Sequence, residues 1–205
     1  MGKYDCPFFA NKHYHVFNHA VGSEDLYLID ENYRFFKQQV AKYFRRVSDL
    51  YCFNFLPNHF HIFLRIKAEE ELRIIFQELH PGKTLCDSNI PDFVLNQFSN
   101  CFNSYTKSFN KWNRRMGRLF MESVKRKQVQ DEEYFTKIIH YIHANAVHHG
   151  ICKRIEDWKY SSYHDLINGE ISFLSGNEVL DWFGGLEGFI QFHQQPINLK
   201  IKIDY

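Results

Sequence analysis

The sequence predicts an α+β fold in which an antiparallel sheet is covered by helices on one face. Segments with strand and helix patterns alternate along the chain, and several strand segments are too short and too mixed for a doubly wound sheet. A length of 205 residues fits one domain with a small appendage. A hydrophobic content of 44% is enough for a substantial core.

The first part of the chain contains three strand segments and one helix. Residues 12–21 alternate in polarity and are rich in aromatic side chains, which indicates a strand. Asp30 is a plausible N-cap for a helix over residues 31–47, where apolar side chains recur at helical spacing. Residues 50–55 and 58–66 are strand segments on either side of a proline. They form either one bent strand or a hairpin.

The second part of the chain is mostly helical. Residues 69–80 predict a helix that ends at a Pro-Gly pair, and residues 92–112 carry the apolar stripe of a long amphipathic helix. Residues 118–121 predict a short strand. A further helix runs from Asp131, as its cap, to about residue 148, and Gly150 is a natural stop. An irregular C-terminal part follows.

Two histidines stand out inside the strand segment 58–66. His59 and His61 bracket Phe60, and successive strand side chains point to opposite faces, so the two imidazoles share a face. Such a pair can hold one divalent cation or bind one phosphate. The competing interpretation is structural, because a His-x-His on a strand is more often a hydrogen-bonded or surface pair than a pair of metal ligands.

A second group of functional side chains lies on the helix that ends near residue 148. Tyr141 and Asn145 are four residues apart and therefore share a helix face. Together with His59 and His61 they would supply two imidazoles, one amide oxygen and one oxygen nucleophile, which suits Mg²⁺ or Mn²⁺ beside a phosphate. Taken singly, Tyr141 is more often a core residue and Asn145 a helix cap.

Charge is balanced globally and uneven locally. The formal net charge of +1 creates no global basic field, whereas residues 111–127 hold seven basic side chains against Glu122 alone. We expect this segment to follow a nucleic-acid backbone, although a solvated basic loop would have the same composition. The seven residues are Lys111, Arg114, Arg115, Arg118, Lys125, Arg126 and Lys127.

The cysteines and the N-terminus indicate the compartment. The five cysteines contain no Cys-x-x-Cys pair, so neither a disulfide framework nor a structural zinc site is expected. The first residues lack the apolar core of a signal peptide, and no run of about 18 apolar residues occurs. We therefore expect a cytoplasmic protein without a membrane partner.

The joint pattern resembles the single-tyrosine HUH transposases (the IS200-like superfamily), and within them the REP-associated tyrosine transposases. The resemblance runs over roughly residues 10–165, and the order and spacing of its motifs make it specific. Its anchors are Tyr-His-Val-Phe-Asn at 14–18, Leu-Pro-Asn-His-Phe-His-Ile at 56–62, Gly-Arg-Leu-Phe at 117–120, Tyr-Ile-His-Ala-Asn at 141–145, and Asp-Trp-Lys-Tyr-Ser-Ser-Tyr at 157–163.

The resemblance implies a ferredoxin-like sheet with the histidine pair on a central strand. It also implies that His59 and His61 bind the divalent metal, that Tyr141 is the nucleophile, and that Asn145 completes the metal site. The chain departs from the family at Ala146, where a proline commonly follows the asparagine. That departure concerns the local backbone and leaves the ligand in place.

The activity implied by the resemblance is DNA transposition. A single-strand endonuclease and strand transferase would cleave single-stranded or hairpin DNA through a 5′-phosphotyrosine intermediate, with Mg²⁺ or Mn²⁺ as cofactor. Residues 1–165 would form the catalytic domain and residues 166–205 a C-terminal extension of unknown role. Monomer and homodimer both remain open. The alternatives are a non-catalytic nucleic-acid-binding module on the same fold, and a metal-dependent hydrolase that uses water as its nucleophile.

Overall fold

Four strands form one antiparallel sheet in the computed structural model, which describes residues 5–121 and 124–196. The strands are β1 (His13–His19), β2 (Ser48–Leu56), β3 (His59–Ile66) and β4 (Lys125–Val129), and their spatial order is β2-β3-β1-β4. Each neighbouring pair is antiparallel. The α+β class and the ferredoxin-like sheet are therefore confirmed, with β3, the strand of the histidine pair, in a central position.

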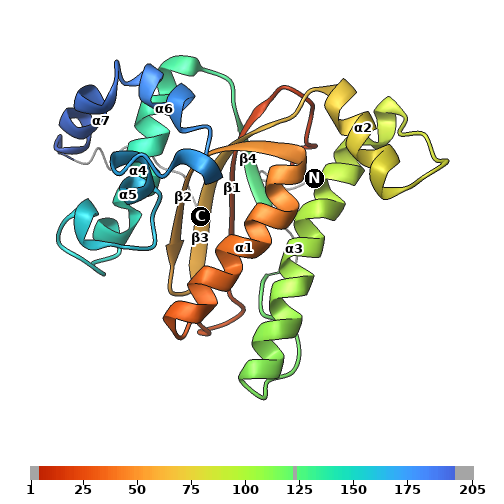
Figure 1. Cartoon of the computed structure of the whole chain (residues 1–205). Helices are drawn as coiled ribbons and strands as arrows, with labels where there is room; N and C mark the ends of the chain where they lie inside the picture. Colours follow the sequence, from red (N-terminus) through yellow and green to blue (C-terminus); the bar gives the residue numbers. More distant parts are fainter. Residues whose placement is uncertain (1–4, 122–123, 197–205) are drawn as a thin grey trace.

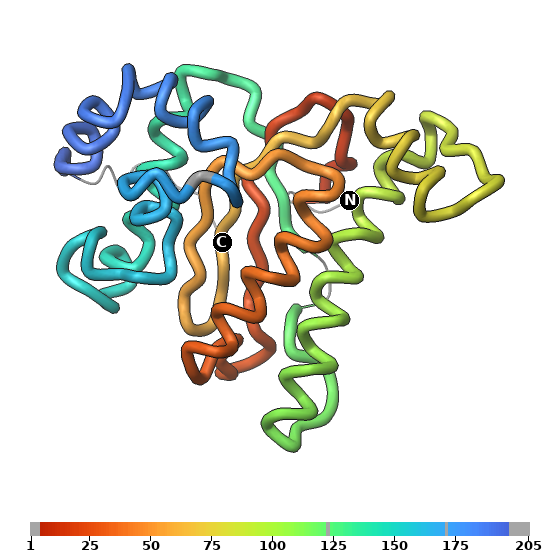
Figure 2. The backbone as a smooth tube through the Cα atoms, viewed as in Figure 1, coloured from red at the N-terminus to blue at the C-terminus, as the bar shows by residue number. Residues whose placement is uncertain are grey.

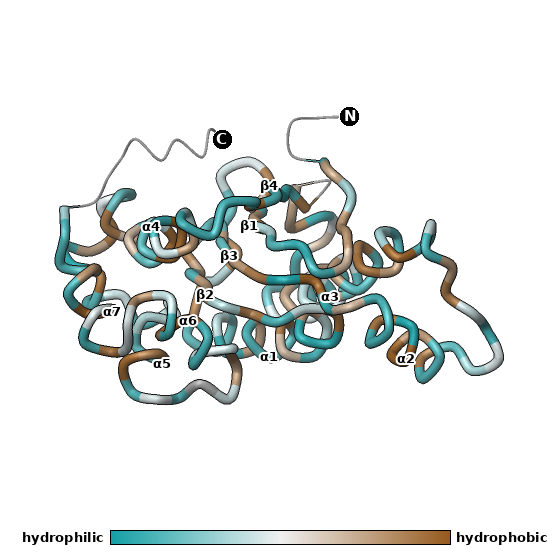
Figure 3. Tube along the Cα trace, turned by 90° about the horizontal axis from the view of Figure 1, so that it is seen from above, coloured by the Kyte–Doolittle hydropathy of each residue, from teal (hydrophilic) through white to brown (hydrophobic). Residues whose placement is uncertain are grey.

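Helices α1 (Asp30–Val47) and α3 (Ile90–Trp112) cover one face of the sheet, while α4 (Phe135–His148) lies against the other (Figures 1 and 3). The alternation of side chains along β3 shows this division. Phe60 contacts Phe36 of α1 at a ring-centroid distance of 5.3 Å, whereas Phe63 contacts Phe135 of α4 at 5.2 Å. Helix α4 thus covers the sheet face that bears His59 and His61.

The break between the second and third strands is a hairpin. Pro57 and Asn58 form its turn, and the pairing begins directly beside them, with Leu56 opposite His59. The carbonyl of Pro57 accepts the backbone N–H of Leu26 at 2.7 Å, which ties the turn to the chain leading into α1. Of the two arrangements left open by the sequence, the structure therefore has the hairpin.

The expected N-cap of the first helix is wrong by one residue. Ile29 occupies the cap position, and Asn32 supplies the capping contact because its Oδ1 accepts the backbone N–H groups of Leu28 and Ile29. Asp30 is the first helical residue. Its carboxylate instead accepts hydrogen bonds from the Lys159 ammonium, at 2.6 Å, and from the hydroxyl of Tyr160.

The strand predicted at residues 118–121 is also misplaced. Phe120 makes only an isolated bridge with Ala20, and its ring is buried against Phe102 at 4.8 Å, while the fourth strand starts at Lys125. The helix predicted from residue 131 begins with a short 3₁₀ turn, in which Asp131 Oδ1 accepts the backbone N–H of Glu133.

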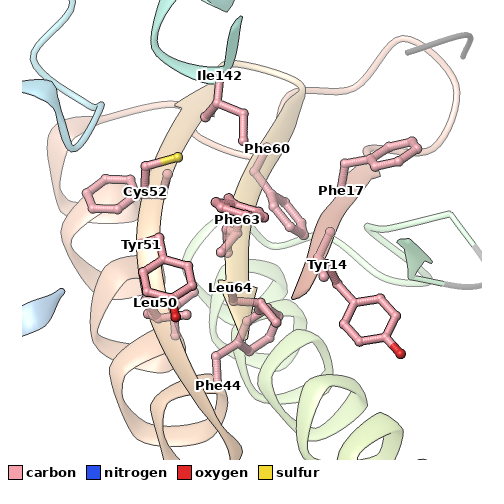
Figure 4. Packing of buried hydrophobic residues seen from close by; sticks show 14 of the residues in the cluster. Tyr14, Phe17, Phe44, Leu50, Tyr51, Cys52, Phe60, Phe63, Leu64 and Ile142 are labelled. Atoms are coloured by element: carbon pink, nitrogen blue, oxygen red, sulfur yellow. The ribbon is translucent and has the colours of Figure 1, made fainter. Parts of the chain in front are cut away.

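Aromatic rings make up much of the core. Phe44 of α1 stacks on Phe98 of α3 at 3.9 Å between centroids, and the hydroxyl of Tyr105 donates to the carbonyl of Leu26 at 2.5 Å. Figure 4 shows Phe60 and Leu64 on β3 and Ile142 reaching from α4 towards the strands. The high aromatic content of the chain is thus used mainly inside the molecule.

The remaining helices lie to the two sides of the sheet (Figure 1). Helix α2 (Glu69–Leu79) projects beyond one end of α3, as the chain trace in Figure 2 shows. Helices α5 (Tyr163–Ile167), α6 (Gly176–Trp182) and α7 (Leu186–His193) gather near β2 and α4 (Figure 1). Within residues 5–121 and 124–196, no helix is long and apolar enough to cross a membrane.

Candidate active site

Histidines from two strands meet on the sheet face that α4 covers. The antiparallel register pairs His19 of β1 with His59 of β3, and Phe17 with His61. His15 is two residues before Phe17 and therefore lies on the same face, one position further along. The rings of His19 and His59 stack at 4.5 Å, and those of His15 and His61 at 5.0 Å.

The two predicted ligands are buried and hydrogen-bonded through Nδ1. His59 Nδ1 lies 2.7 Å from Asn58 Oδ1, and His61 Nδ1 lies 2.9 Å from His15 Nε2. An amide oxygen only accepts, so Nδ1 of His59 carries the proton and the lone pair is on Nε2. His59 therefore has the tautomer in which imidazole binds a metal ion through Nε2, with Asn58 as its outer partner.

Burial keeps these imidazoles neutral. It lowers the pKa of His59 to about 3, with smaller contributions from His19 and His149, and it lowers the pKa of His61 well below the usual value near 6.5. The pKa of His15 falls to about 3, chiefly through burial and also through the positive charge of Lys127. Neutral imidazoles are the form that ligates metal ions, so the histidines are ready to bind at neutral pH.

Helix α4 brings the predicted nucleophile to these histidines. The ring centroid of Tyr141 lies 6.1 Å from that of His61 and 6.5 Å from that of His15, in edge-to-face orientation. Two residues at the C-terminal end of α4 also contact the side chains of this site. The ring of His148 is 5.5 Å from Tyr141, and the ring of His149 is 4.7 Å from His59.

Asn145 lies on this helix between Tyr141 and His149. Its side chain is buried, and its Nδ2 donates to the carbonyl of Tyr141 at 2.9 Å. That hydrogen bond fixes the amide orientation and leaves Oδ1 as the atom through which an amide ligates a cation. The structure thus places Tyr141 against His61, and Asn145 one helical turn further along α4, before His149, whose ring contacts His59.

Buried polar contacts fix α4 to the sheet. Asn54 of β2 donates a hydrogen bond from its side-chain Nδ2 to the carbonyl of Ile142 at 2.7 Å. His143, on the next position, bonds through Nε2 to the hydroxyl of Ser162 at 2.8 Å and through Nδ1 to His193 Nε2 at 2.9 Å. These contacts come from three different segments, so the helix of Tyr141 is held on several sides.

His59, His61 and Asn145 are the predicted side chains that could ligate one divalent cation. In the parts of the chain that the structure describes, no group of three or more His, Cys, Asp or Glu side chains is placed to hold a metal ion. Two imidazoles and one amide oxygen would supply only part of a coordination shell. Substrate phosphate and water, which Mg²⁺ commonly keeps as ligands, would have to complete it.

Four histidines of this site were not singled out by the sequence. His15, His19, His148 and His149 join it only through the strand register and the length of α4. The sequence did contain a signal for the two histidines of β1. Histidines occupy positions 13, 15 and 19, which are separated by even numbers of residues and therefore share one strand face.

The predicted basic segment is divided between two faces. In the β1–β4 register, Lys125 is opposite Phe17 and Lys127 is opposite His15, so both lysines lie on the face of the histidines. Arg126 belongs to the other face. Its side chain is buried and donates to the carbonyls of Cys6, at 2.6 Å, and Val124, at 3.0 Å.

The other basic residues of the segment lie around the end of α3. Lys111 is in its last turn, and Arg114, Arg115 and Arg118 follow in the loop. Arg115 contacts the carboxylate of Glu24 at 2.5 Å and donates to the carbonyl of Gly117 at 3.2 Å. The structure therefore does not bring all seven basic residues together. Lys125 and Lys127 are the two that flank the histidine site.

Comparison with known proteins gives one sequence relative and one structural relative. A protein of Haemophilus influenzae, whose name places it among the REP-associated tyrosine transposases, is 28% identical over 119 residues. The match covers 57% of this chain and 59% of that protein, less than two thirds of the relative's length. No protein-family model matches the chain.

A solved structure, described as a REP-associated tyrosine transposase bound to a REP hairpin, has the same fold. The superposition has a TM-score of 0.57 at 16% sequence identity, and it covers 84% of this chain and 90% of the other. In fold over most of its length, and in sequence over 119 residues, the chain is similar to the REP-associated tyrosine transposases, which confirms the resemblance predicted from its motifs.

Proposed function

We propose that this protein cleaves and rejoins single-stranded DNA through a covalent tyrosine intermediate, as a step in DNA transposition. The observation that carries the proposal is the position of Tyr141, whose ring lies 6.1 Å from that of the proposed ligand His61. A phenol on a helix has no structural need for two buried imidazoles as neighbours. A phosphate bound next to them would bring phosphorus within reach of the phenolic oxygen.

The proposed step balances without an external energy source. The Tyr141 oxygen forms a bond to phosphorus while the bond from phosphorus to the 3′ oxygen breaks. The phenol loses its proton, and the departing oxygen takes one up as a 3′-hydroxyl. The DNA then carries a 5′-phosphotyrosine link, and attack by a 3′-hydroxyl on that link restores a phosphodiester and frees Tyr141.

His59, His61 and Asn145 would hold the cofactor, Mg²⁺ or Mn²⁺. A divalent cation there would offset negative charge on the bound phosphate and favour the phenolate form of a nearby tyrosine. The neutral, buried imidazoles and the fixed Asn145 amide support this assignment. The residues themselves orient the phosphate and exclude water from the face under α4.

Single-stranded DNA near a hairpin is the proposed substrate. The solved relative is described as bound to a REP hairpin, and this chain shares its fold. Lys125 and Lys127 lie on the face of the histidines and would bind the DNA backbone beside the cleaved phosphate. The basic residues Lys111, Arg114, Arg115 and Arg118 at the end of α3 would contact more distant phosphates.

Replacement of Tyr141 by phenylalanine tests the nucleophile. We expect wild-type protein incubated with labelled hairpin DNA and Mn²⁺ to form an adduct that survives denaturing electrophoresis. Tyr141→Phe should abolish the adduct and leave hairpin affinity within about threefold, because only the phenolic oxygen is removed. Tyr134→Phe, seven residues earlier in the 3₁₀ turn that precedes α4, is the matched control and should still form the adduct. Loss of the adduct in the control alone would contradict the assignment.

Removal of a proposed ligand tests the role of the metal. His59→Ala should reduce the rate of adduct formation at least 100-fold, and chelator should do the same to wild-type protein. Undiminished cleavage in the presence of chelator would show that no metal is needed.

The alternative is a non-catalytic nucleic-acid-binding module. The observation that favours it is the burial of Tyr141, which is only 7% exposed and must become reachable to attack DNA. Tight hairpin binding without any adduct, under conditions that saturate the metal site, would decide for this alternative.

A further inference from the structure

His148, the last residue of α4, lies beside the proposed nucleophile. It follows Tyr141 by seven residues, which is about two turns of an α-helix, so the two side chains share a face of α4. Their ring centroids are 5.5 Å apart, with an angle of 49° between the ring planes. The corresponding distances from Tyr141 are longer, at 6.1 Å to His61 and 6.5 Å to His15. Among these three imidazoles, that of His148 is therefore the nearest to Tyr141.

One ring nitrogen of His148 is buried and unused. Its Nε2 is closed to solvent and has no hydrogen-bond partner within the residues that the structure describes. The side chain as a whole is only half-buried, so other edges of the ring reach water. A buried polar atom without a partner is costly, and a catalytic role is one of the reasons for which proteins retain it. Because water does not reach Nε2, the group that it meets must come from a neighbouring side chain.

The other two imidazoles near Tyr141 are engaged with each other. His15 Nε2 and His61 Nδ1 are 2.9 Å apart, and His61 is also a proposed metal ligand. His148 stands outside this pair. Its pKa lies below the usual value, chiefly through burial and also through His149, so the ring is neutral at neutral pH. With the proton on Nδ1, a neutral ring has its lone pair on Nε2, ready to accept a proton.

The proposed cleavage step requires such an acceptor. A tyrosine hydroxyl is a weak nucleophile until its proton is removed, and an adjacent base is the usual means of removing it. Tyr141 is only 7% exposed, so it presents little surface to bulk water. A side chain within the site is therefore better placed than solvent to take the proton, and histidine is the residue that most often does so in enzymes.

We propose that His148 is the general base of the cleavage step and takes the proton of the Tyr141 hydroxyl on Nε2 as the phenolic oxygen attacks phosphorus. This rests on the proposed function, because it takes Tyr141 as the nucleophile. A rotation of the His148 ring, or one bridging water, brings Nε2 to the phenolic oxygen, and catalytic hydrogen bonds commonly tighten in this way when substrate binds.

The proton and the bonds balance in both directions. The O–H bond of Tyr141 breaks, an N–H bond forms at His148 Nε2, and the ring becomes an imidazolium. The bond from phosphorus to the 3′ oxygen breaks at the same time, and that oxygen takes a proton from water. When a 3′-hydroxyl later attacks the phosphotyrosine link, the imidazolium returns its proton to the departing phenolic oxygen.

Replacement of His148 by phenylalanine tests the base. His148→Phe keeps an aromatic ring at this half-buried position and removes both nitrogens. We expect the rate of adduct formation with labelled hairpin DNA and Mn²⁺ to fall about 100-fold, while hairpin affinity stays within about threefold of wild type. His80→Phe, the same change at an exposed histidine after α2, is the matched control and should alter neither quantity. A His148→Phe rate within about threefold of wild type would overturn the proposal.

Added imidazole separates a chemical role of His148 from a structural one. His148→Ala leaves a half-exposed space that free imidazole can enter. Imidazole should raise the rate of this variant by about tenfold or more, in proportion to its concentration, and more basic imidazoles of equal size should act more strongly. It should not raise the rate of wild type, which also reports any effect of imidazole on Mn²⁺, or of His148→Phe, whose ring fills the space. A slowed His148→Ala variant that imidazole does not rescue would overturn the proposal.

Wild-type protein separates failure of this assignment from failure of the proposed function. An absence of adduct in wild type would contradict the proposed function, and the role of His148 with it. A wild-type adduct that forms equally fast in His148→Phe would contradict the role of His148 alone.

Discussion

At the scale of single residues, Asn58 determines which nitrogen of His59 carries a proton. Its Oδ1 lies 2.7 Å from His59 Nδ1, and this contact favours the tautomer with the lone pair on Nε2. Such outer partners typically change metal affinity by about 10- to 100-fold. We therefore expect Asn58→Ala to weaken Mn²⁺ binding about tenfold in isothermal titration calorimetry.

Two further variants make the Asn58 prediction specific. Asn58→Asp keeps an oxygen acceptor and should retain affinity, whereas Asn96→Ala, at an exposed position of α3, should have no effect. Metal affinity that is unchanged in Asn58→Ala would show that this contact does not orient His59.

The residues of the site differed in how far the sequence could predict them. His59, His61, Tyr141 and Asn145 were singled out by their spacings within one strand and one helix, which are local properties, whereas their roles were implied by the resemblance to the REP-associated tyrosine transposases. His15 could not be assigned to the site from the sequence. It lies 46 residues before His61, and the two side chains meet only through the register of β1 against β3. The basic segment failed as a single surface because Arg126 faces away from Lys125 and Lys127, as strand alternation requires.

At the scale of elements, a chain of hydrogen bonds joins α7 to α4, the helix of the proposed nucleophile. His193 Nδ1 donates to the carbonyl of Phe189, so its Nε2 accepts from His143 Nδ1. His143 Nε2 then accepts from the hydroxyl of Ser162, which itself accepts the backbone N–H of Phe53. The predicted C-terminal extension, residues 166–205, therefore contributes a buried partner to α4.

Removal of the last imidazole in this chain should destabilise the protein. His193→Leu would leave the buried Nδ1–H of His143 without an acceptor, at a cost of about 1–3 kcal/mol. We expect the free energy of unfolding in urea to fall by that amount and adduct formation to slow because α4 loses a support. His193→Gln, which can both accept and donate, should recover most of the loss.

An exposed neighbour supplies the control for this variant. Gln194→Leu changes the next residue without touching the hydrogen-bond chain and should leave stability within about 0.5 kcal/mol of wild type. Equal stability of His193→Leu and wild type would show that the extension does not support α4.

At the scale of the whole molecule, the pattern of β3 explains both the success and the limit of the fold prediction. Phe60 and Ile62 form an apolar face, which agrees with the predicted cover by helices, and Phe60 contacts Phe36 of α1. The opposite face also carries an apolar residue, Phe63, beside the two histidines, and this was the local sign that a further helix covers it. Which helix does so could not be predicted, because that depends on how the chain leaves β4.

The burial of histidines makes the stability of the whole molecule sensitive to acid. Ten of the twelve histidines have a pKa below the usual value, chiefly because burial disfavours the charged ring. In the unfolded chain they titrate near pH 6.5, whereas the pKa of His193 in the folded protein is about 3. Between these values the unfolded state binds more protons, so the free energy of unfolding must fall as pH falls.

The expected loss is about 1 kcal/mol for each fully buried histidine between pH 7.5 and pH 5.5. Urea unfolding at pH 7.5, 6.5 and 5.5, with chelator present so that metal release does not contribute, should show stability decreasing by several kcal/mol over this range. His193→Gln removes one such group and should reduce the decrease by about 1 kcal/mol. A stability that stays constant across the range would mean that the folded and unfolded states bind the same number of protons. The histidines would then titrate near pH 6.5 in the folded protein as well, which would contradict the lowered pKa values of the buried imidazoles.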